Sequence, residues 1–258
     1  ATDRFGKGRC TWGRAVARVE SPDFLHWDIV DPGKAPMVMA PDANDPPGTE
    51  IYSMLVFPYE TLYLGLVQVF QNRADTSRLD IQLAVSRDGI RFQRVAQGEP
   101  LLACGDVGAW DRFNQSLACN APIPVGDSLR IYYGGRQSRH GPYSGRDVGR
   151  RVSCIGLATV TRDRFVSLGA SFDGGQVVTK PLRLMGKTIH LNAKCDYGEI
   201  LVEALDVQGR VLARSQPLAA DGLDLPVVWE QGKLPQGPQP VVLRFTLRNG
   251  LWFSFWAT

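Results

Sequence analysis

Apolar and polar residues alternate along short segments of this chain, and a period of two is the pattern of β-strands. The alternation is clearest at residues 14–19, 80–85 and 154–160. The 27 glycines and 17 prolines supply many turns and leave little room for long helices. The sequence therefore predicts an all-β protein built from antiparallel strands.

A short turn phrase follows each of these three strands. It contains Ser or Thr, any residue, Asp, and then an aromatic residue two to four positions later, at residues 21–27 (SPDFLHW), 86–92 (SRDGIRF) and 161–165 (TRDRF). Ser and Asp side chains accept backbone N–H groups in tight turns, and Gly89 is free to adopt positive φ. We interpret the phrase as a hairpin turn whose aromatic residue begins the returning strand.

A second repeat consists of an apolar strand, a tight turn and an aromatic-rich strand, at residues 51–65 and 118–132. Together the two repeats define a module of four antiparallel strands, which is the size of a propeller blade. Two whole modules fit residues 48–98 and 110–168, and the segment before residue 31 supplies the outer strands of an earlier one. The prediction is a partial propeller of about two and a half blades.

So few blades cannot close a ring, since propellers need about four to eight. Residues 1–170 are therefore predicted to be an incomplete propeller, either because further blades lie outside this sequence or because two chains join. An open blade exposes apolar sheet faces to water. We expect a homodimer or higher oligomer that completes the ring.

Residues 174–258 have a different character. They contain short alternating segments separated by turn residues, and residues 206–210 (DVQGR) form a clear hairpin turn. The pattern predicts a small β-sandwich. Its expected strands lie at residues 188–193, 198–205, 226–229, 241–247 and 251–256.

Composition argues against several classes of partner. The net charge is +3 and the basic residues are scattered, so no nucleic-acid surface is expected. No apolar run of about 18 residues is present, so we expect no membrane span. The polar first residues lack the apolar core of a signal peptide. The expected location is therefore open: the cytoplasm, or outside the cell with a signal outside this chain.

Metal ions and cofactors have little support in the sequence. The three histidines are far apart, and the five cysteines form no C-x-x-C pair. Residues 42–45 carry alternating oxygen ligands but lack the remaining ligands of a calcium loop. No P-loop or dinucleotide fingerprint is present. We predict no cofactor and no metal.

Taken together, these phrases resemble bacterial proteins of the five-bladed propeller superfamily that contains invertases, levansucrases, arabinanases and β-xylosidases. The greatest likeness is to a glycosyl-hydrolase-like branch with a sandwich after the propeller, and the chain looks like the C-terminal part of such a protein. The matching phrases are SPDFLHW, PPGTEIYSMLVFPYETLYLGL, DIQLAVSRDGIRF, GDSLRIYYGG, IGLATVTRDRFVSL and TKPLRL.

The resemblance implies carbohydrate chemistry at the propeller axis. Glycoside hydrolysis uses two carboxyl groups that flank the scissile bond. In this superfamily the general acid is a Glu at the start of a middle blade, and Glu50 matches it, with Tyr52 nearby as a sugar contact. The family's other two carboxylates lie on the first two blades, outside this sequence, which argues against ordinary invertase-like catalysis. Asp111 is a candidate surrogate carboxylate.

Other candidates lie at the blade entries and in a glycine-rich loop at residues 134–143. Trp110 is a candidate for stacking on a sugar ring, and Gln68 and Asn120 for hydrogen bonds to its hydroxyl groups. Arg136 and His140 are candidates for binding a carboxylate or phosphate group, and His140 also for acid–base work. Each has a structural alternative: packing between blades, bonding to a neighbouring strand, or a surface loop.

Three hypotheses follow. The first, which we favour, is a glycosidase with Glu50 as general acid. The second is a non-catalytic carbohydrate-binding protein that uses the same cleft and the sandwich. The third is a hydrolase of another ester class, since fold does not fix function.

Overall fold

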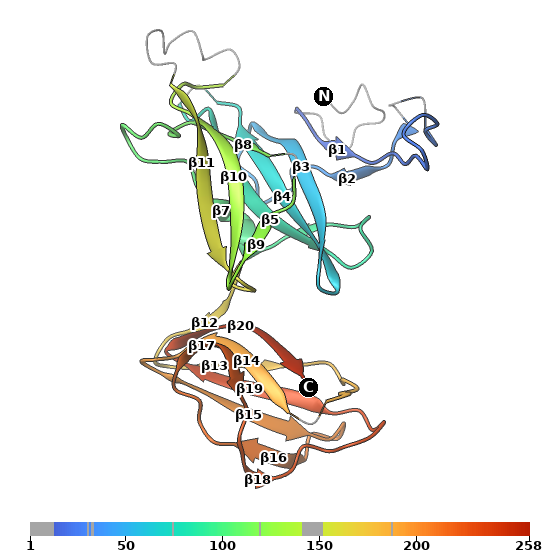
Figure 1. The fold of residues 1–258 in the computed structure, drawn as a ribbon, viewed down its shortest axis with the longest axis vertical. Helices are drawn as coiled ribbons and strands as arrows, with labels where there is room; N and C mark the ends of the chain where they lie inside the picture. Colours follow the sequence, from blue (N-terminus) through green and yellow to red (C-terminus); the bar gives the residue numbers. More distant parts are fainter. Residues whose placement is uncertain are drawn as a thin grey trace. The chain divides into compact units, whose positions relative to one another are not determined.

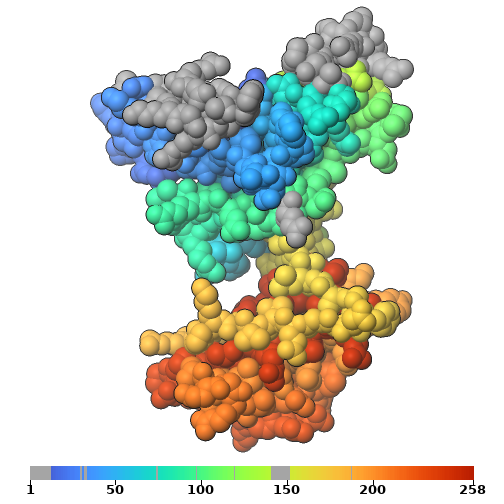
Figure 2. Space-filling model, turned by 180° about the vertical axis from the view of Figure 1, so that it is seen from behind, coloured from blue at the N-terminus to red at the C-terminus, as the bar shows by residue number. Residues whose placement is uncertain are grey.

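The computed structural model describes residues 13–29, 31, 34–73, 75–118, 120–140, 152–186 and 188–258 of the chain. It divides into two compact units, residues 1–160 and 161–258. By colour they run from blue to yellow-green and from yellow to red (Figures 1 and 2). Each is described by itself below.

The first unit is formed by β-strands. A small sheet pairs β1 (Val16–Ala17) with β2 (Met37–Met39). The larger sheet has the order β11-β10-β8-β5-β4-β3, with β6 and β7 paired to β5 and β9 paired to β10 (Figure 1). Its members are β3 (Thr49–Tyr59), β4 (Leu62–Gln71), β5 (Arg78–Ser86), β6 (Gln93–Arg94), β7 (Pro100–Leu102), β8 (Asn114–Leu117), β9 (Ile123–Val125), β10 (Ser128–Arg136) and β11 (Ser153–Thr161), with the 3-10 turn η3 (Ala96–Gly98) between β6 and β7.

Within this sheet the first blade follows the expected four-strand order, whereas the second ends at β11, because residues 168–170, expected to complete it, pair with residues 250–252 of the second unit. β3, β4 and β5 are consecutive antiparallel neighbours, and β6 and β7 complete that blade on the far side of β5. The next blade contains β8 and β9, β10 and β11. The two blades meet where Leu79 of β5 pairs in parallel with Asn114 of β8. The fold class is therefore confirmed as all-β, with a partial propeller.

One strand differs from the prediction. The apolar segment expected to begin at Ala118 contains only β9 in its second half, while β8 begins earlier, at Asn114. β8 and β9 pair with different parts of β10. Pro122 lies in the gap between them, and proline has no N–H to donate to a ladder. The inner strand of this blade is therefore interrupted.

The turn phrase has the same hydrogen bonds in its first two copies. Asp23 Oδ1 accepts backbone N–H groups from the residues two and three positions later, and Asp88 Oδ1 does likewise. The residue after each Asp has positive φ, 64° at Phe24 and 71° at Gly89. Phe92 of the second copy packs against the first unit's core. The predicted turn chemistry is confirmed at both places.

The second unit is a two-sheet sandwich. One sheet has the order β12-β20-β14-β17 and the other β13-β19-β15-β16-β18 (Figure 1). The strands are β12 (Leu168–Ala170), β13 (Gly175–Val178), β14 (Ile189–Lys194), β15 (Glu199–Leu205), β16 (Val211–Ser215), β17 (Asp221–Pro226), β18 (Trp229–Gly232), β19 (Val242–Arg248) and β20 (Gly250–Ala257).

A continuous core joins the two sheets of the sandwich. Leu191 of β14 and Trp252 of β20 belong to the same buried cluster as Val202 of β15 and Phe245 of β19. The Phe245 and Trp252 rings stack at 4.1 Å between centroids. Inward-facing residues on alternate positions produce this core, as the period of two predicts.

Two details of the sandwich differ from the sequence prediction. The strand expected at residues 226–229 is instead the junction at which β17 ends and β18 begins. β12 pairs with β20, so residues 168–170, which we expected in the propeller, lie in the sandwich. The turn at residues 206–210 is confirmed, since Asp206 Oδ1 accepts the backbone N–H groups of Gln208 and Arg210.

Candidate functional site

Glu50 is a buried carboxylate at the start of β3, with only 6% of the residue exposed. Its Oε2 accepts a hydrogen bond from Arg14 Nη1, and its Oε1 accepts one from Asn72 Nδ2 at 2.7 Å. A Cβ at Gly13 would come within 2.4 Å of Glu50 Cγ, so glycine is needed there. Both carboxylate oxygens are therefore held by the protein.

The fold explains why these groups meet. β3 and β4 pair with Glu50 opposite Phe70, so Asn72, just after β4, reaches the same end of the hairpin. Ile51 N–H donates to Arg14 C=O at 3.0 Å, which fixes the segment before β1 against β3. Glu50 thus lies where two sheets of the first unit meet.

Tyr52 and His140 lie beside Glu50. Their rings are edge-to-face at 5.0 Å between centroids, and His140 is also edge-to-face with Phe70 at 5.3 Å. The Arg14 guanidinium lies over the Tyr52 ring at 4.8 Å. His140 Nδ1 is 3.4 Å from Asn114 Nδ2. We call Arg14, Glu50, Tyr52, Asn72, Asn114 and His140 the Glu50 cluster.

Three influences lower the pKa of His140. Burial is the largest, and the positive charges of Arg14 and Arg136 add to it, while Glu50 acts in the opposite direction. The neutral imidazole is therefore favoured. A neutral imidazole offers one acceptor nitrogen and one donor nitrogen, which suits contact with a hydroxyl group.

Arg136 is the other sequence candidate near this cluster. It ends β10 and is paired across the sheet with Asn114 of β8. Its side chain is exposed. Residues 141–143 of the predicted glycine-rich loop lie outside the described residues. Four of the candidates from sequence, Glu50, Tyr52, Arg136 and His140, are therefore gathered in one region.

Gln68 has a different environment. It is buried on β4, where its Oε1 accepts from Ser53 Oγ at 2.8 Å and its Nε2 donates to the Gln115 carbonyl. Gln115 belongs to β8, so Gln68 links the two blades. Both ends of its amide are used within the protein.

Trp110 and Asp111 form a separate packing group. The Trp110 ring stacks on Tyr133 at 5.7 Å, and Tyr133 Oη donates to Asp111 Oδ2 at 2.9 Å. Burial and the neighbouring Asp111 raise the pKa of Tyr133 to about 12, which keeps this donor protonated. A Cβ at Gly135 would come within 2.6 Å of Asp111 Cβ. These contacts pack Trp110 and Asp111 against β10.

Asn120 lies outside the strands and is exposed, and its Nδ2 donates to the Ala121 carbonyl at 3.0 Å. The expectation that it lies mid-strand was wrong, because the strand is interrupted here. Sequence reasoning also missed Arg14, Asn72 and Asn114. No motif marks them, since each becomes significant only through its contact with Glu50 or His140.

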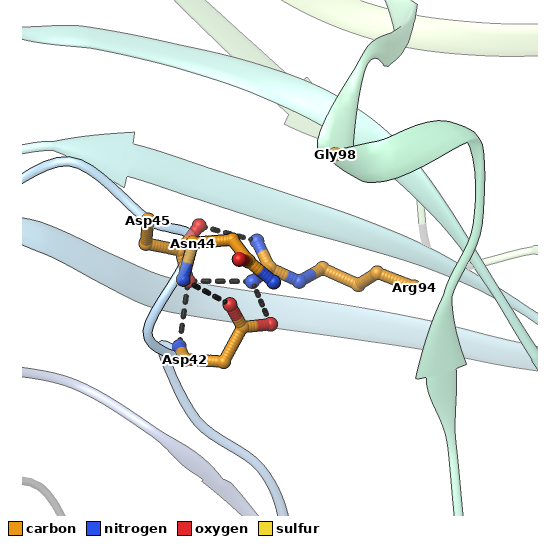
Figure 3. A pocket seen from close by; sticks show the side chains of 5 residues that line it. All are labelled: Asp42, Asn44, Asp45, Arg94 and Gly98. Carbon is orange, nitrogen blue, oxygen red and sulfur yellow. Dashed lines mark hydrogen bonds and ion pairs between the residues drawn. The ribbon is translucent and has the colours of Figure 1, made fainter.

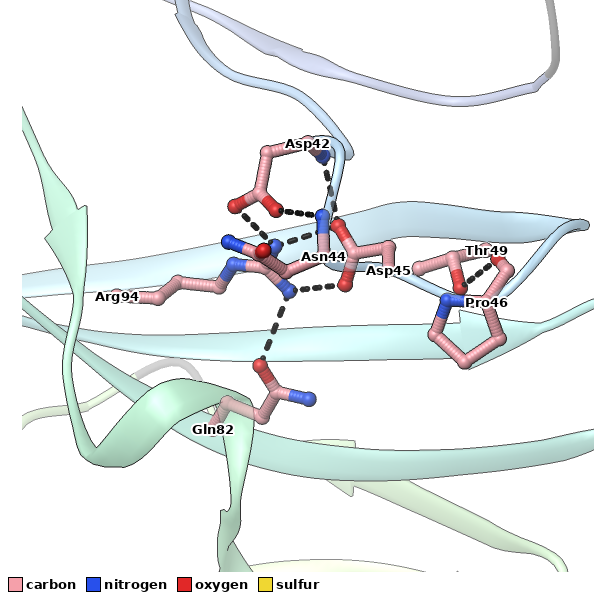
Figure 4. Close-up of polar contacts among 7 residues, drawn as sticks. All are labelled: Asp42, Asn44, Asp45, Pro46, Thr49, Gln82 and Arg94. Carbon is pink, nitrogen blue, oxygen red and sulfur yellow. Dashed lines mark hydrogen bonds and ion pairs between the residues drawn. The ribbon is translucent and has the colours of Figure 1, made fainter.

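A polar hollow of about 370 Å³ lies beside β6, away from the Glu50 cluster (Figure 3). The buried Arg94 guanidinium donates to both oxygens of Asp45 and to Asp42 Oδ2 at 2.7 Å. It also donates to Gln82 Oε1 at 3.1 Å (Figure 4). This network fixes the loop at residues 42–45 to the sheet.

Among the described residues, no three or more His, Cys, Asp or Glu side chains form a group suited to a metal ion. No helix of the described part of the chain is long and apolar enough to cross a membrane.

No family model and no curated protein matches this sequence. Among solved structures, an N-acetylgalactosamine deacetylase from F. plautii, in complex with blood group B trisaccharide, is 20% identical over 58% of this chain and 42% of that chain, with a TM-score of 0.42. A structure described as a glycoside hydrolase is 15% identical over 58% and 37%, with a TM-score of 0.41. A glycoside hydrolase family 43 arabinoxylan arabinofuranohydrolase from Bacillus subtilis is 8% identical over 80% and 53%, with a TM-score of 0.25.

The chain thus spans less than half the length of the first two of these structures.

Proposed function

We propose that this chain is a glycoside-hydrolase-like protein that binds carbohydrate at the Glu50 cluster. The observation that supports this most directly is the buried Glu50 carboxylate, fixed by Arg14 and Asn72 next to the Tyr52 ring. Sugars are recognised by planar polar groups that bind hydroxyls and by aromatic rings that cover their C–H faces. The cluster supplies both.

The same geometry favours binding over hydrolysis. Both oxygens of Glu50 are engaged, so Glu50 would have to release Arg14 or Asn72 before it could protonate a glycosidic oxygen. Hydrolysis also needs a second carboxyl group across the scissile bond. Asp111, the surrogate expected from sequence, is bound to Tyr133 instead.

The binding test uses a panel of neutral and acidic oligosaccharides, titrated into the full chain and followed by calorimetry. We expect at least one to bind and Tyr52→Ala to weaken it about tenfold, since the ring contact is lost. Tyr63→Ala is the matched control, because Tyr63 is a partly exposed tyrosine of the adjacent strand, β4. Failure of the whole panel to bind would overturn the proposal.

A second assay separates binding from hydrolysis. If the native chain turns over aryl glycosides, Glu50→Gln should abolish turnover and spare binding, and Glu50 is then the general acid. If Glu50→Gln leaves turnover unchanged, Glu50 has no part in the chemistry. No turnover by the native chain would leave a carbohydrate-binding protein.

We also propose that two copies of the chain associate through β11. This strand is at the end of the larger sheet and carries Ile155 and Leu157, which are 83% and 50% exposed. An edge strand with exposed apolar side chains is suited to pairing with another strand. Light scattering should give the mass of a dimer or larger oligomer, and Ile155→Lys should give the monomer. A monomeric native mass would contradict this.

A further inference from the structure

The sandwich contains a chain of hydrogen bonds that joins an aspartate, a histidine and a threonine. The His190 imidazole lies between the other two side chains: its Nδ1 is 2.5 Å from Asp224 Oδ1, and its Nε2 is 2.8 Å from Thr258 Oγ1. His190 is 34 positions from Asp224 and 68 from Thr258 along the chain. Strand pairing therefore brings these three side chains together.

Three adjacent strands of one sheet supply these residues (Figure 1). His190 of β14 is paired with Pro226 of β17 on one side and with Trp256 of β20 on the other. Asp224 lies two residues before Pro226, and Thr258 lies two residues after Trp256. Side chains two positions apart in extended chain point to the same face of a sheet, so all three polar groups share one face.

The imidazole and the hydroxyl group are both held in place. The Trp256 ring stacks on the His190 ring, with 5.4 Å between centroids and 10° between planes. Thr258 exchanges two backbone hydrogen bonds with Thr188, at 2.9 and 3.0 Å. The backbone at Gly186 also approaches Thr258 closely, because a Cβ at Gly186 would lie 2.4 Å from the Thr258 nitrogen.

The two hydrogen bonds set the direction in which the imidazole can act. A carboxylate has only acceptor atoms, so His190 Nδ1–H donates to Asp224 Oδ1. In the neutral imidazole Nε2 is then the acceptor, and the Thr258 hydroxyl donates to it. The nitrogen that faces the hydroxyl is therefore the one that can take its proton.

This geometry is that of an activated nucleophile. A hydroxyl group within hydrogen-bond reach of a base, where a third group orients the base, can attack an acyl carbon. Such a triad is recognised by geometry and not by the order of its residues in the chain. Only 16% of the His190 side chain is exposed, which shields the base from water, whereas Thr258 is exposed and reachable by a substrate.

We propose that the sandwich has a catalytic site of its own, which hydrolyses carboxylic esters. Thr258 is the nucleophile, His190 is the general base, and Asp224 is a positioning residue that holds the imidazole. Small acyl groups such as acetyl suit the site, because the Trp256 ring lies beside the imidazole and the backbone at Gly186 lies beside Thr258. This proposal does not rest on carbohydrate binding at the Glu50 cluster.

The reaction has two balanced steps. In the first, Thr258 Oγ1 forms a bond to the acyl carbon while its proton moves to His190 Nε2; the C–O bond to the alcohol then breaks, and the alcohol leaves with that proton. In the second, water attacks the acyl-threonine, and His190 takes a proton from the water and returns it to Thr258 Oγ1. The sum is ester plus water to acid plus alcohol.

The test uses p-nitrophenyl acetate and the full chain. We expect release of p-nitrophenol and, in protein quenched with acid, one acetyl group on the peptide that contains Thr258, located by tandem mass spectrometry. Thr258→Val should abolish this adduct, and Thr258→Ser should keep it, because serine retains the hydroxyl group.

Variants of the base and of its partner complete the test. His190→Gln should slow acylation at residue 258 at least about a hundredfold. Asp224→Asn should slow it about tenfold or more, and Asp224→Glu should restore part of the rate, because the carboxylate is retained.

Two matched controls should leave the rate unchanged. His26→Gln alters another histidine that is bonded to an aspartate, Asp23, and Thr246→Val alters a threonine of the other sheet that is bonded to Gln176. Circular dichroism confirms that each variant is folded.

The absence of an acetyl group at Thr258 in the native chain would overturn the proposal, as would an acylation rate that His190→Gln leaves unchanged. If His190→Gln is not folded, the Thr258→Val and Thr258→Ser pair decides: equal turnover by these two variants would overturn it. Failure of sugars to bind the Glu50 cluster would leave this proposal standing, and ester hydrolysis would leave the carbohydrate-binding proposal to its own test.

Discussion

Glu50 in the first unit and Glu203 in the second are both buried glutamates bound by arginine, but their partners come from different places. Glu203 lies on β15 directly opposite Arg214 of β16 and Arg244 of β19. Its Oε1 accepts from Arg214 Nη2 at 2.7 Å and its Oε2 from Arg244 Nε at 2.6 Å. Three adjacent strands of one sheet thus complete the interaction.

The pKa of Glu203 reflects this closed arrangement. Burial by itself would raise it, but the hydrogen bonds and charges of Arg214 and Arg244 outweigh burial and lower it. A carboxylate of this kind stabilises a sheet.

Glu50 draws its partners from separate segments. Arg14 precedes β1 and Asn72 follows β4, and the His140 imidazole comes from beyond β10. Chain segments that converge in this way leave polar and aromatic groups of several kinds around one carboxylate. Both glutamates are buried and bound by arginine, so these features do not distinguish a structural glutamate from one at a candidate ligand site. The difference is that the partners of Glu203 lie on neighbouring strands, whereas those of Glu50 come from separate segments of the chain.

The largest expected effect is on stability at Glu203. Glu203→Gln should lower the free energy of unfolding by about 2–3 kcal/mol, because two arginines lose their charged partner. This is below the cost for a fully buried pair, since the Arg214 and Arg244 side chains are 47% and 30% exposed. Glu50→Gln should lower the free energy of unfolding by less, because only one arginine loses its charged partner. Urea denaturation measures the free energy of unfolding of both variants. A larger decrease for Glu50→Gln than for Glu203→Gln would contradict this prediction.

Asp80 on β5 is a third carboxylate, and it lacks a full set of hydrogen-bond partners. Its Oδ1 has no hydrogen-bond partner within the described structure. Burial raises its pKa from 3.8 to about 6, Arg78 lowers it and Glu99 raises it. Because the folded-state pKa is above the unfolded value, the protonated group stabilises the fold below about pH 4, and that contribution is lost as the pH rises through about 6.

Asp80→Asn should therefore stabilise the protein by about 2 kcal/mol at pH 8 and have little effect below pH 4. Asp88→Asn is a control whose effect on stability should depend on pH in the opposite direction. Backbone N–H groups of Arg91 and Ile90 and the side-chain hydroxyl of Ser86 donate to Asp88 and lower its pKa to about 2. The stability that Asp88 contributes is therefore present above its unfolded-state pKa and is lost as the pH falls toward 2. Denaturation at several pH values measures both, and parallel profiles for the two variants would contradict the assignment.

The smallest expected effect is at His140. Arg136→Gln should raise the pKa of His140, because one of the positive charges that lower it is removed. The pKa should stay below its ordinary value, since burial and Arg14 still act. NMR titration of the imidazole protons measures this. An unchanged pKa would show that Arg136 is too far away to belong to the site.

Much of the fold was predictable because its signals are local. The Ser-x-Asp phrase carries its own hydrogen-bond acceptors, and both Asp23 and Asp88 use them as expected. Strands β14, β15, β19 and β20 match the alternation within one or two residues. The interrupted strand at Ala118 was missed, because a run of apolar residues does not show where prolines break the ladder.

The candidate site was predictable only in part. Glu50, Tyr52 and His140 do lie together, but Trp110 and Asp111 pack against Tyr133, and Gln68 joins β4 to β8. The sequence did not distinguish a polar residue that bonds to a neighbouring strand from one that joins the Glu50 cluster. Side-chain direction alternates along a strand, so one interruption or bulge reverses the expectation.

By itself, the sequence determined the all-β class, the hairpin turns and the repeating blade order, because strand period and turn chemistry depend on residues a few positions apart. Only the tertiary structure decided that Arg14, Glu50, Asn72 and His140 meet. These residues are far apart in the chain, and their contacts depend on strand register and on how one blade packs against the next. Those long-range pairings give Glu50 its charged and aromatic neighbours.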